Sequence, residues 1–239
     1  MEHEYSPHRV AETIQHLCRY WEEKRKADAG RSGELLSSRA WTIALSREAG
    51  TQGAAIGHAV GQQLGWPVYD HELLERIAQD MGTHTRLLES LDERRTSWLL
   101  ETFAAFQTAP FTTEGAYVHR LAKTVLALGS QGECVIVGRG AALILPAEKT
   151  LRVRLIAPLK DRIATIQKRL GLSHEKAIRQ VEVMDRERDS FVRAHFAKDP
   201  TDARNYDLIL HSSRLGVKGC AQTIVAALKC LETAPGQSG

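Results

Sequence analysis

The chain has 239 residues, of which 43% are hydrophobic and 26% are charged, and these values are ordinary for a globular protein with a sizeable core. A formal net charge of +3 suits anionic small molecules but is too weak to indicate nucleic acid by itself. The four cysteines show no C-x-x-C spacing, which argues against a metal site or a disulfide framework. No apolar run approaches the roughly 18 residues that span a bilayer.

The first part of the chain predicts a helical extension. Residues 8–28 carry Val10, Ile14 and Leu17 along one helical stripe, and a glycine-bearing linker follows at 29–33. We therefore treat residues 1–38 as an N-terminal extension. It would pack on the main domain or on a second subunit, and in the second case the helix forms a homo-oligomer.

From residue 41 onward, short apolar runs alternate with helical patterns. Most runs are continuously apolar, as in strands that are buried on both faces of a parallel sheet. This rhythm predicts an α/β fold of three layers, with a five-stranded, mainly parallel sheet between helices. We place strands at 41–45, 66–69, 134–137, 151–156 and 206–210, and helices at 54–64, 159–170, 173–195 and 217–232, with several more between 71 and 131.

The helical stretch at 71–131 is longer than an ordinary crossover between two strands. It predicts a helical insertion within one domain that spans residues 39–233. Residues 234–239 are expected to form a flexible tail.

The turn after the first strand is the most informative segment. It leaves a buried strand, contains two glycines and enters a helix, so backbone N–H groups and the positive end of the helix dipole can converge on an anion. We expect this turn to bind phosphate groups through Ser46, Arg47, Gly50, Thr51, Gln52 and Gly53.

This turn departs from the usual phosphate loop, G-x-x-x-x-G-K-[ST]. Glu48 stands at the first glycine, Ala54 at the lysine and Ala55 at the hydroxyl residue. Arg47 is one candidate for the missing cation, and a surface salt bridge between Arg47 and Glu48 is an equally good interpretation. The hydroxyls of Ser46 and Thr51 are candidates to replace part of a metal site, and Asp185 and Asp189 are candidates to hold metal-bound water.

Polar residues also follow the second and third strands, where α/β sheets bind their ligands. Asp70 precedes a helical pattern and is first of all an N-cap, with substrate binding as a second role. In Gly138-Arg139-Gly140 the glycines allow a close approach to a ligand, so Arg139 is our main candidate for binding an anionic substrate.

Arg186, Arg188 and Arg193 lie on the helix expected at 173–195, and of these three we favour Arg186 and Arg193 as functional residues. Arg186 and Arg193 are seven residues apart and therefore share a helix face. They are candidates for closing over bound phosphates. The alternative is a solvated face on which Asp185 and Asp189 pair with these arginines.

Four segments, taken in order, resemble the cytidylate kinase-like family of phosphate-loop nucleoside monophosphate kinases. The likeness covers about residues 41–230 and implies a P-loop kinase-like fold with a helical, acceptor-binding insertion and a lid at about 173–205. The segments are I-A-L-S-R-E-A-G-T-Q-G-A-A-I at 43–56, L-G-W-P-V-Y-D-H-E-L-L at 64–74, V-I-V-G-R-G-A at 135–141, and an arginine-bearing stretch that ends in Y-D-L-I-L-H-S-S at 185–213.

The resemblance implies ATP-dependent phosphoryl transfer to a nucleoside monophosphate, with CMP or dCMP as the acceptor and Mg²⁺ as the cofactor. Such chemistry rests on positioning and charge neutralisation, for which arginine is well suited. The implied catalytic residues are Arg139, Arg186 and Arg193. The loop at 46–53 would hold the ATP phosphates, and Asp70, Gly138 and Arg139 would hold the acceptor.

Two alternatives stay open. Because Glu48, Ala54 and Ala55 remove the usual lysine and hydroxyl, the chain could be a nucleotide-binding regulatory pseudokinase. It could also be a kinase of another small metabolite. We expect nucleotides as partners, no nucleic acid and no membrane. The N-terminus lacks a signal-peptide pattern, which predicts a cytoplasmic location.

Overall fold

The computed structural model describes residues 40–91 and 113–233, together with Arg19 and Glu23. The chain divides into two compact units, one formed by residues 41–69 and 133–239 and the other by residues 1–40 and 70–132. The predicted N-terminal extension lies outside the described residues except for Arg19 and Glu23, which are helical, and so does the predicted tail at 234–239.

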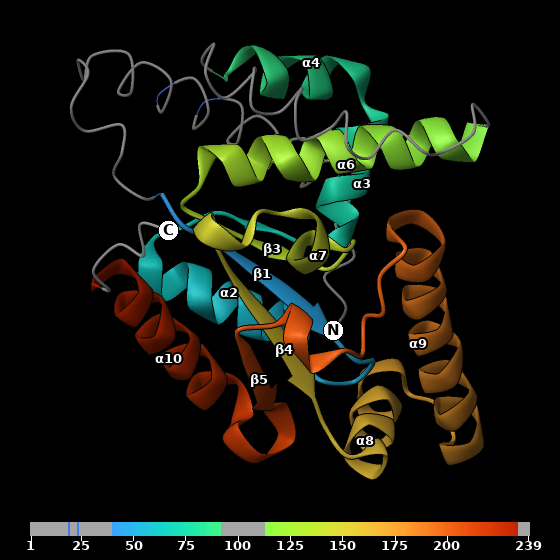
Figure 1. Ribbon diagram of the computed structural model, residues 1–239. Coiled ribbons are helices and arrows are strands. Elements are labelled where there is room, and N and C mark those ends of the chain that lie inside the picture. The colour runs from blue at the N-terminus through green and yellow to red at the C-terminus, as the bar shows by residue number, and fades with distance from the viewer. Residues whose placement is uncertain (1–18, 20–22, 24–39, 92–112, 234–239) are drawn as a thin grey trace. The chain divides into compact units, whose positions relative to one another are not determined.

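The first unit, which we call the sheet unit, is built on a five-stranded sheet (Figure 1). Its strand order is β2-β3-β1-β4-β5, and every neighbouring pair is parallel, so the predicted fold class is confirmed. The second strand is shorter than predicted and the fifth begins later. The strands are β1 (Thr42–Arg47), β2 (Val68–Tyr69), β3 (Cys134–Val137), β4 (Thr150–Ile156) and β5 (Leu208–His211).

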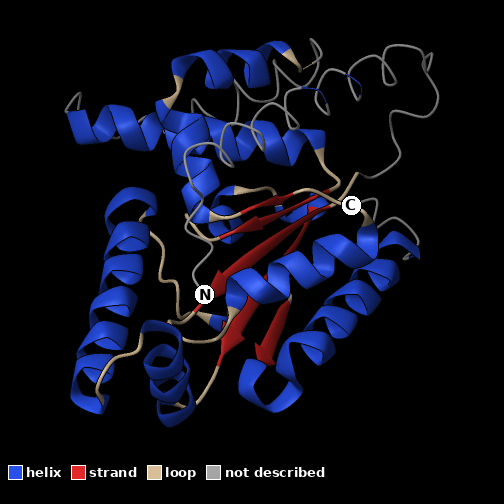
Figure 2. Ribbon diagram, turned by 180° about the vertical axis from the view of Figure 1, so that it is seen from behind, coloured by secondary structure: helices blue, strands red, loops and turns tan. Residues whose placement is uncertain are grey.

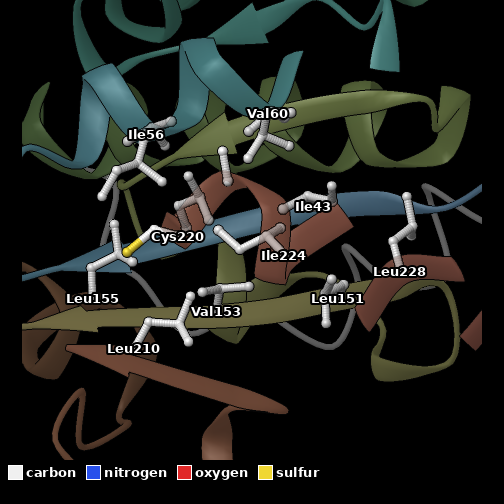
Figure 3. Packing of buried hydrophobic residues seen from close by; sticks show 14 of the residues in the cluster. Ile43, Ile56, Val60, Leu151, Val153, Leu155, Leu210, Cys220, Ile224 and Leu228 are labelled. Carbon is white, nitrogen blue, oxygen red and sulfur yellow. The ribbon is translucent and has the colours of Figure 1, made fainter. Parts of the chain in front are cut away.

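The core of the sheet unit lies between the sheet and helices α2 (Gly53–Leu64) and α10 (Ser212–Thr233), as Figure 3 shows. Ile43 of β1 is fully buried there, together with Val153 of β4 and Ile224 of α10. Alternate residues of a strand share one face, which is why the apolar side chains of neighbouring strands meet on the same side. Each such fully buried side chain stabilises the fold by about 1.5–3 kcal/mol.

Three helices complete the sheet unit near the carboxyl ends of the strands. The short helix α7 (Ala141–Ile144) follows β3 and packs against β1 and β4. Helices α8 (Leu159–Leu170) and α9 (His174–Phe196) lie side by side (Figures 1 and 2). One-turn 3₁₀ helices cover Ala147–Lys149 and Ala203–Asn205.

The last helix is preceded by a helical turn that was not predicted. The last helix was expected at 217–232, but helical structure begins at Ser212, directly after β5. A break at Gly216, with φ +68° and ψ 175°, separates the first turn from the rest. Glycine adopts this conformation without steric cost, so the sequence pattern found only the part after the break.

The second unit, which we call the helical unit, contains the insertion between β2 and β3. Its described helices are α3 (His71–Gln79), α4 (Met81–Glu89) and α6 (Thr113–Gln131), and α6 packs against both of the others. Across the part of the chain that the structure describes, no helix has both the length and the apolar character needed to cross a membrane.

Candidate functional site

The turn between β1 and α2 has the geometry of an anion-binding loop. Two of its residues adopt left-handed backbone conformations, Gly50 with φ +83° and Gln52 with φ +58°. The first helical hydrogen bond runs from the N–H of Ile56 to the carbonyl of Gln52. Within the described structure, the N–H groups of residues 52–55 have no acceptor, as is usual for the first turn of a helix. These donors and the helix dipole are available to a phosphate group.

Glu48, which stands at the first glycine of the usual motif, has a clear structural role. Its Oε2 accepts a hydrogen bond from the N–H of Ala157, 3.2 Å away, and lies 3.4 Å from Nε of Arg162. A glutamate can therefore replace the motif glycine because its side chain turns away from the loop backbone. It connects the loop to the end of β4 and to α8.

Asp185 of α9 connects the loop to α8 and α9. Its Oδ1 accepts a hydrogen bond from the N–H of Ala49, 2.6 Å away, and its Oδ2 forms a salt bridge with Arg162. The guanidinium of Arg162 is thus shared by Glu48 and Asp185. The methyl group of Ala49 is fully buried in a small apolar cluster formed by Ile163 and Ile166 of α8 and Ala177 and Val181 of α9. The loop, α8 and α9 are held together by both polar and apolar contacts.

The two hydroxyls considered as metal ligands already have structural contacts. Thr51 is almost completely buried and donates to the carbonyl of Glu48, at 2.8 Å, which closes the turn. The Ser46 hydroxyl lies 3.2 Å from the hydroxyl of Tyr206. Among the described residues, no group of three or more histidine, cysteine, aspartate or glutamate side chains could hold a metal ion. Because Ala55 also lacks a hydroxyl, the loop offers poor side-chain ligands for a resident Mg²⁺.

Arg47 extends from the turn between β1 and α2 to the loop after β3. A Cβ atom added at Gly53 would lie 3.0 Å from Cγ and 3.1 Å from Cδ of Arg47. A Cβ atom added at Gly138 would overlap Nη1 of the same side chain. The methylene groups of Arg47 therefore pass over Gly53, and its guanidinium lies against the backbone of Gly138. Glu48, the salt-bridge partner considered for it, directs its carboxylate to Arg162 and Ala157.

Arg139 is held in an unusual conformation at the carboxyl end of β3. Its φ is +50°, between Gly138 and Gly140 with φ of +91° and +73°. The guanidinium carbon lies 5.4 Å from the centre of the Phe191 ring of α9, within the range of a cation–π contact. Burial lowers the pKa of Arg139 below its usual value, and the charge of Glu187 partly opposes this shift.

Helix α9 reaches the same loop through a second aromatic ring. A Cβ atom added at Gly140 would lie 2.7 Å from Cε2 of Phe196, so glycine permits this close packing. Phe196 in turn makes an edge contact with Phe191, with ring centres 5.7 Å apart. The loop at 138–140 is therefore fixed by aromatic side chains from the end of α9.

The arginine of α9 with a buried Nη1 is Arg188, which the sequence analysis considered but did not select. Its Nη1 is buried, makes no hydrogen bond within the described structure and lies 3.9 Å from Oδ1 of Asp185. Burial lowers the pKa of Arg188, while Asp185 raises it and the charges of Arg169 and Arg139 lower it further. The sequence signal for an inward position of Arg188 is its place three residues after Asp185. This signal becomes informative only once the structure shows that Asp185 contacts the loop.

Arg186 and Arg193 lie elsewhere on α9. Arg186 is exposed, and Arg193 is half exposed and forms a salt bridge with Asp199 at 2.8 Å. The structure does not bring them to Arg139 or to the turn between β1 and α2. Their role in closing over phosphates stays a prediction.

Asp70 belongs to the helical unit and caps α3. Its Oδ1 accepts a hydrogen bond from the N–H of Leu73 at 3.0 Å, as the N-cap interpretation predicted. Its second predicted role, in acceptor binding, stays a prediction.

The parallel sheet in the order β2-β3-β1-β4-β5, with a glycine-bearing turn between β1 and α2, defines a P-loop kinase-like α/β protein. A model of the cytidylate kinase-like family matches residues 42–214, which is well over half of the chain. The chain belongs to this family, and the resemblance predicted from its four motifs is confirmed.

Individual relatives are more distant. The chain is 31% identical over 93 residues to a cytidylate kinase from Methanopyrus kandleri, a match that covers 35% of this chain and 48% of that protein. It is 32% identical over 92 residues to a uronate isomerase from Corynebacterium glutamicum, covering 38% of this chain and 18% of that protein. The chain therefore spans less than half the length of either of these curated relatives.

A solved structure has a similar fold. The crystal structure of an uncharacterized protein from Eubacterium ventriosum matches with a TM-score of 0.60 at 21% identity. The match covers 82% of this chain and 99% of that one. At this level of identity it supports the fold and says nothing about the substrate.

Proposed function

We propose that the chain transfers a phosphoryl group from ATP to a nucleoside monophosphate, with CMP or dCMP as the acceptor. The observation that carries this proposal is the contact between Arg47 and the backbone of Gly138. It joins the loop suited to donor phosphates to the loop that presents Arg139. Membership of the cytidylate kinase-like family and the similarity to a cytidylate kinase support the same chemistry.

Each part of the site has a distinct role in this proposal. The N–H groups of residues 52–55 bind donor phosphates at the start of α2. Arg139 binds the phosphate of the acceptor, and a planar guanidinium can do so through two hydrogen bonds. Arg188 adds positive charge from α9. Because the loop side chains are poor metal ligands, ATP enters as its Mg²⁺ complex, with the ion held by phosphate oxygens and water.

Three predicted roles extend the proposal. Asp70 contacts the acceptor nucleoside in addition to capping α3. Arg186 and Arg193 approach the phosphates only if α9 changes its position. The helical insertion at about 71–131 has the acceptor-binding role that the family resemblance implies.

The direct test is ADP release by the purified protein. CMP, dCMP, UMP, dTMP, AMP and GMP are supplied one at a time with ATP and Mg²⁺, and a reaction without acceptor measures ATP hydrolysis. We expect acceptor-dependent ADP release that is fastest with CMP or dCMP. Absence of turnover with every monophosphate at high protein concentration would reject the proposal.

A second candidate function is nucleotide binding without phosphoryl transfer. It is favoured by Ala54 and Ala55, which are exposed at the start of α2 and supply neither the lysine nor the hydroxyl. The double variant Ala54→Lys/Ala55→Ser separates the two functions. Activity that appears only in the variant supports the regulatory interpretation, and activity that is present in the wild type and lost in the variant supports a rebuilt active site.

A further inference from the structure

We infer that Arg47 takes the place of the missing phosphate-loop lysine and contacts both the donor phosphates and the phosphate of the acceptor. This inference rests on the proposed function and adds a catalytic residue to it. In the usual loop, the lysine side chain starts from the first turn of the helix and reaches the terminal phosphates of the nucleotide. Here the cation starts from the end of β1 and reaches the same region from the opposite side of the loop.

The path of the side chain supports this role. The methylene groups of Arg47 cross Gly53, at the beginning of α2, and its guanidinium lies on Gly138, beside Arg139. The charged group therefore lies between the helix N-terminus and the acceptor-side arginine. A guanidinium has five N–H donors in a rigid plane, so it can bridge oxygens of two phosphate groups, which a lysine ammonium does less specifically.

Gly53, which Arg47 crosses, supports the same conclusion. Gly53 is not among the glycines with positive φ, so its backbone does not require glycine. Glycine inside a helix costs up to about 1 kcal/mol relative to alanine. What requires glycine at 53 is the close approach of Arg47, since a Cβ atom would lie 3.0 Å from Cγ of that side chain.

The arrangement also explains why Ala54 is tolerated. Ala54 is exposed on the first turn of α2, where a lysine would direct a second cation to the same phosphates. With Arg47 already spanning the two loops, the lysine is redundant. The prediction is that positive charge can be exchanged between positions 47 and 54.

The test has two separate readouts. Calorimetry in EDTA measures the binding of inorganic tripolyphosphate, and steady-state assays with Mg²⁺ measure kcat/KM for ATP and CMP. Tripolyphosphate has no base and needs neither an acceptor nor Mg²⁺, so this readout is separate from turnover. We expect Arg47→Ala to weaken tripolyphosphate binding by about 10-fold or more, because charge-assisted hydrogen bonds are lost. The drop in kcat/KM is expected to be about 100-fold.

Two further variants provide the controls. Arg204→Ala removes the same charge from an arginine whose side chain is 90% exposed and bridged to Asp202, and it should leave both readouts within about 2-fold of wild type. Arg47→Ala/Ala54→Lys should recover part of the lost affinity. Thermal unfolding of each variant shows whether it is folded, and Arg47→Gln, which keeps a polar side chain but removes the charge, replaces Arg47→Ala, with the same expected loss of affinity, if that variant does not fold.

The outcomes separate this inference from the proposed function. Tripolyphosphate affinity that falls in Arg47→Ala supports the role of Arg47, even if the wild type shows no turnover and the kinase proposal fails. Unchanged affinity in Arg47→Ala overturns the role of Arg47, even if the wild type is an active kinase. A wild-type protein that does not bind tripolyphosphate also overturns it.

Discussion

Arg139 shows how the sheet unit maintains one charged side chain in a costly arrangement. A left-handed conformation costs roughly 1–2 kcal/mol for a residue other than glycine. Burial also opposes the charge of Arg139, as the lowered pKa shows. The Phe191 ring and the contact of Phe196 with Gly140 keep the loop in place. We attribute this arrangement to anion binding, because strained residues of this kind cluster at functional sites.

Replacement of Arg139 should affect catalysis far more than folding. We expect Arg139→Ala to lower kcat/KM by about 10²-fold, the usual loss when one preorganised donor to a developing charge is removed. Stability should hold or rise slightly, since a buried charge is lost. Arg139→Lys should restore only part of the activity because an ammonium cannot form the two-pronged contact. Full activity of Arg139→Ala in steady-state assays would contradict the assigned role.

Gly50 provides a test of how rigidly the phosphate loop is held. A Cβ atom there would lie 2.5 Å from the carbonyl oxygen of Arg162, and φ is +83°. Gly50→Ala should therefore destabilise the fold by about 2–4 kcal/mol, from backbone strain and overpacking. Gly65→Ala is the matched control, with φ +69° and open space, and should cost only about 1 kcal/mol. If urea unfolding shows that both variants lose the same free energy of unfolding, α8 does not confine the loop.

Pairs of elements are coupled through a few buried or partly buried polar groups. In the sheet unit, Asp185 joins α9 to the loop and to Arg162 of α8. In the helical unit, Nδ1 of His84 of α4 lies 3.2 Å from the hydroxyl of Thr124 of α6. That hydroxyl donates to the carbonyl of Arg120, so His84 must be the donor to Thr124, with its proton on Nδ1.

The stability of the fold should decrease in acid because of His84. His84 is buried, and burial together with the charges of Lys123, Arg120 and His119 lowers its pKa below the ordinary value of 6.5. Below about pH 6.5 the unfolded chain therefore binds a proton that the folded chain does not, so stability falls as the pH decreases through this range.

Substitution of His84 isolates its effect on stability in acid. Asparagine at position 84 can still donate a hydrogen bond to Thr124 but does not titrate. We expect His84→Asn to reduce the loss of thermal stability between pH 7.5 and pH 5.5, measured by circular dichroism. His119, whose pKa is also lowered by burial, accounts for a remaining part. If His84→Asn and the wild type lose the same thermal stability between pH 7.5 and pH 5.5, His84 does not control the pH dependence of stability.

At the scale of the whole molecule, sequence patterns predicted the helices and strands better than they predicted the contacts between them. The run Cys134–Val137 is buried at every position, so continuous apolar character was enough to place β3. The spacing of Arg186 and Arg193 showed a shared face of α9 but not which face meets the loop. That depends on the hydrogen bond between Asp185 and Ala49, which are 136 residues apart. The path of Arg47 over Gly53 and Gly138 likewise depends on strand order, which no local motif specifies.

The most direct test of phosphoryl transfer is ³¹P nuclear magnetic resonance of the protein with ATP, Mg²⁺ and CMP. We expect the signal of the γ-phosphate of ATP to decrease while signals of ADP and of a cytidine diphosphate appear in equal amounts. Arg47→Ala and Arg139→Ala should each slow this exchange strongly. Release of inorganic phosphate alone, or no change after prolonged incubation with any monophosphate, would contradict the account.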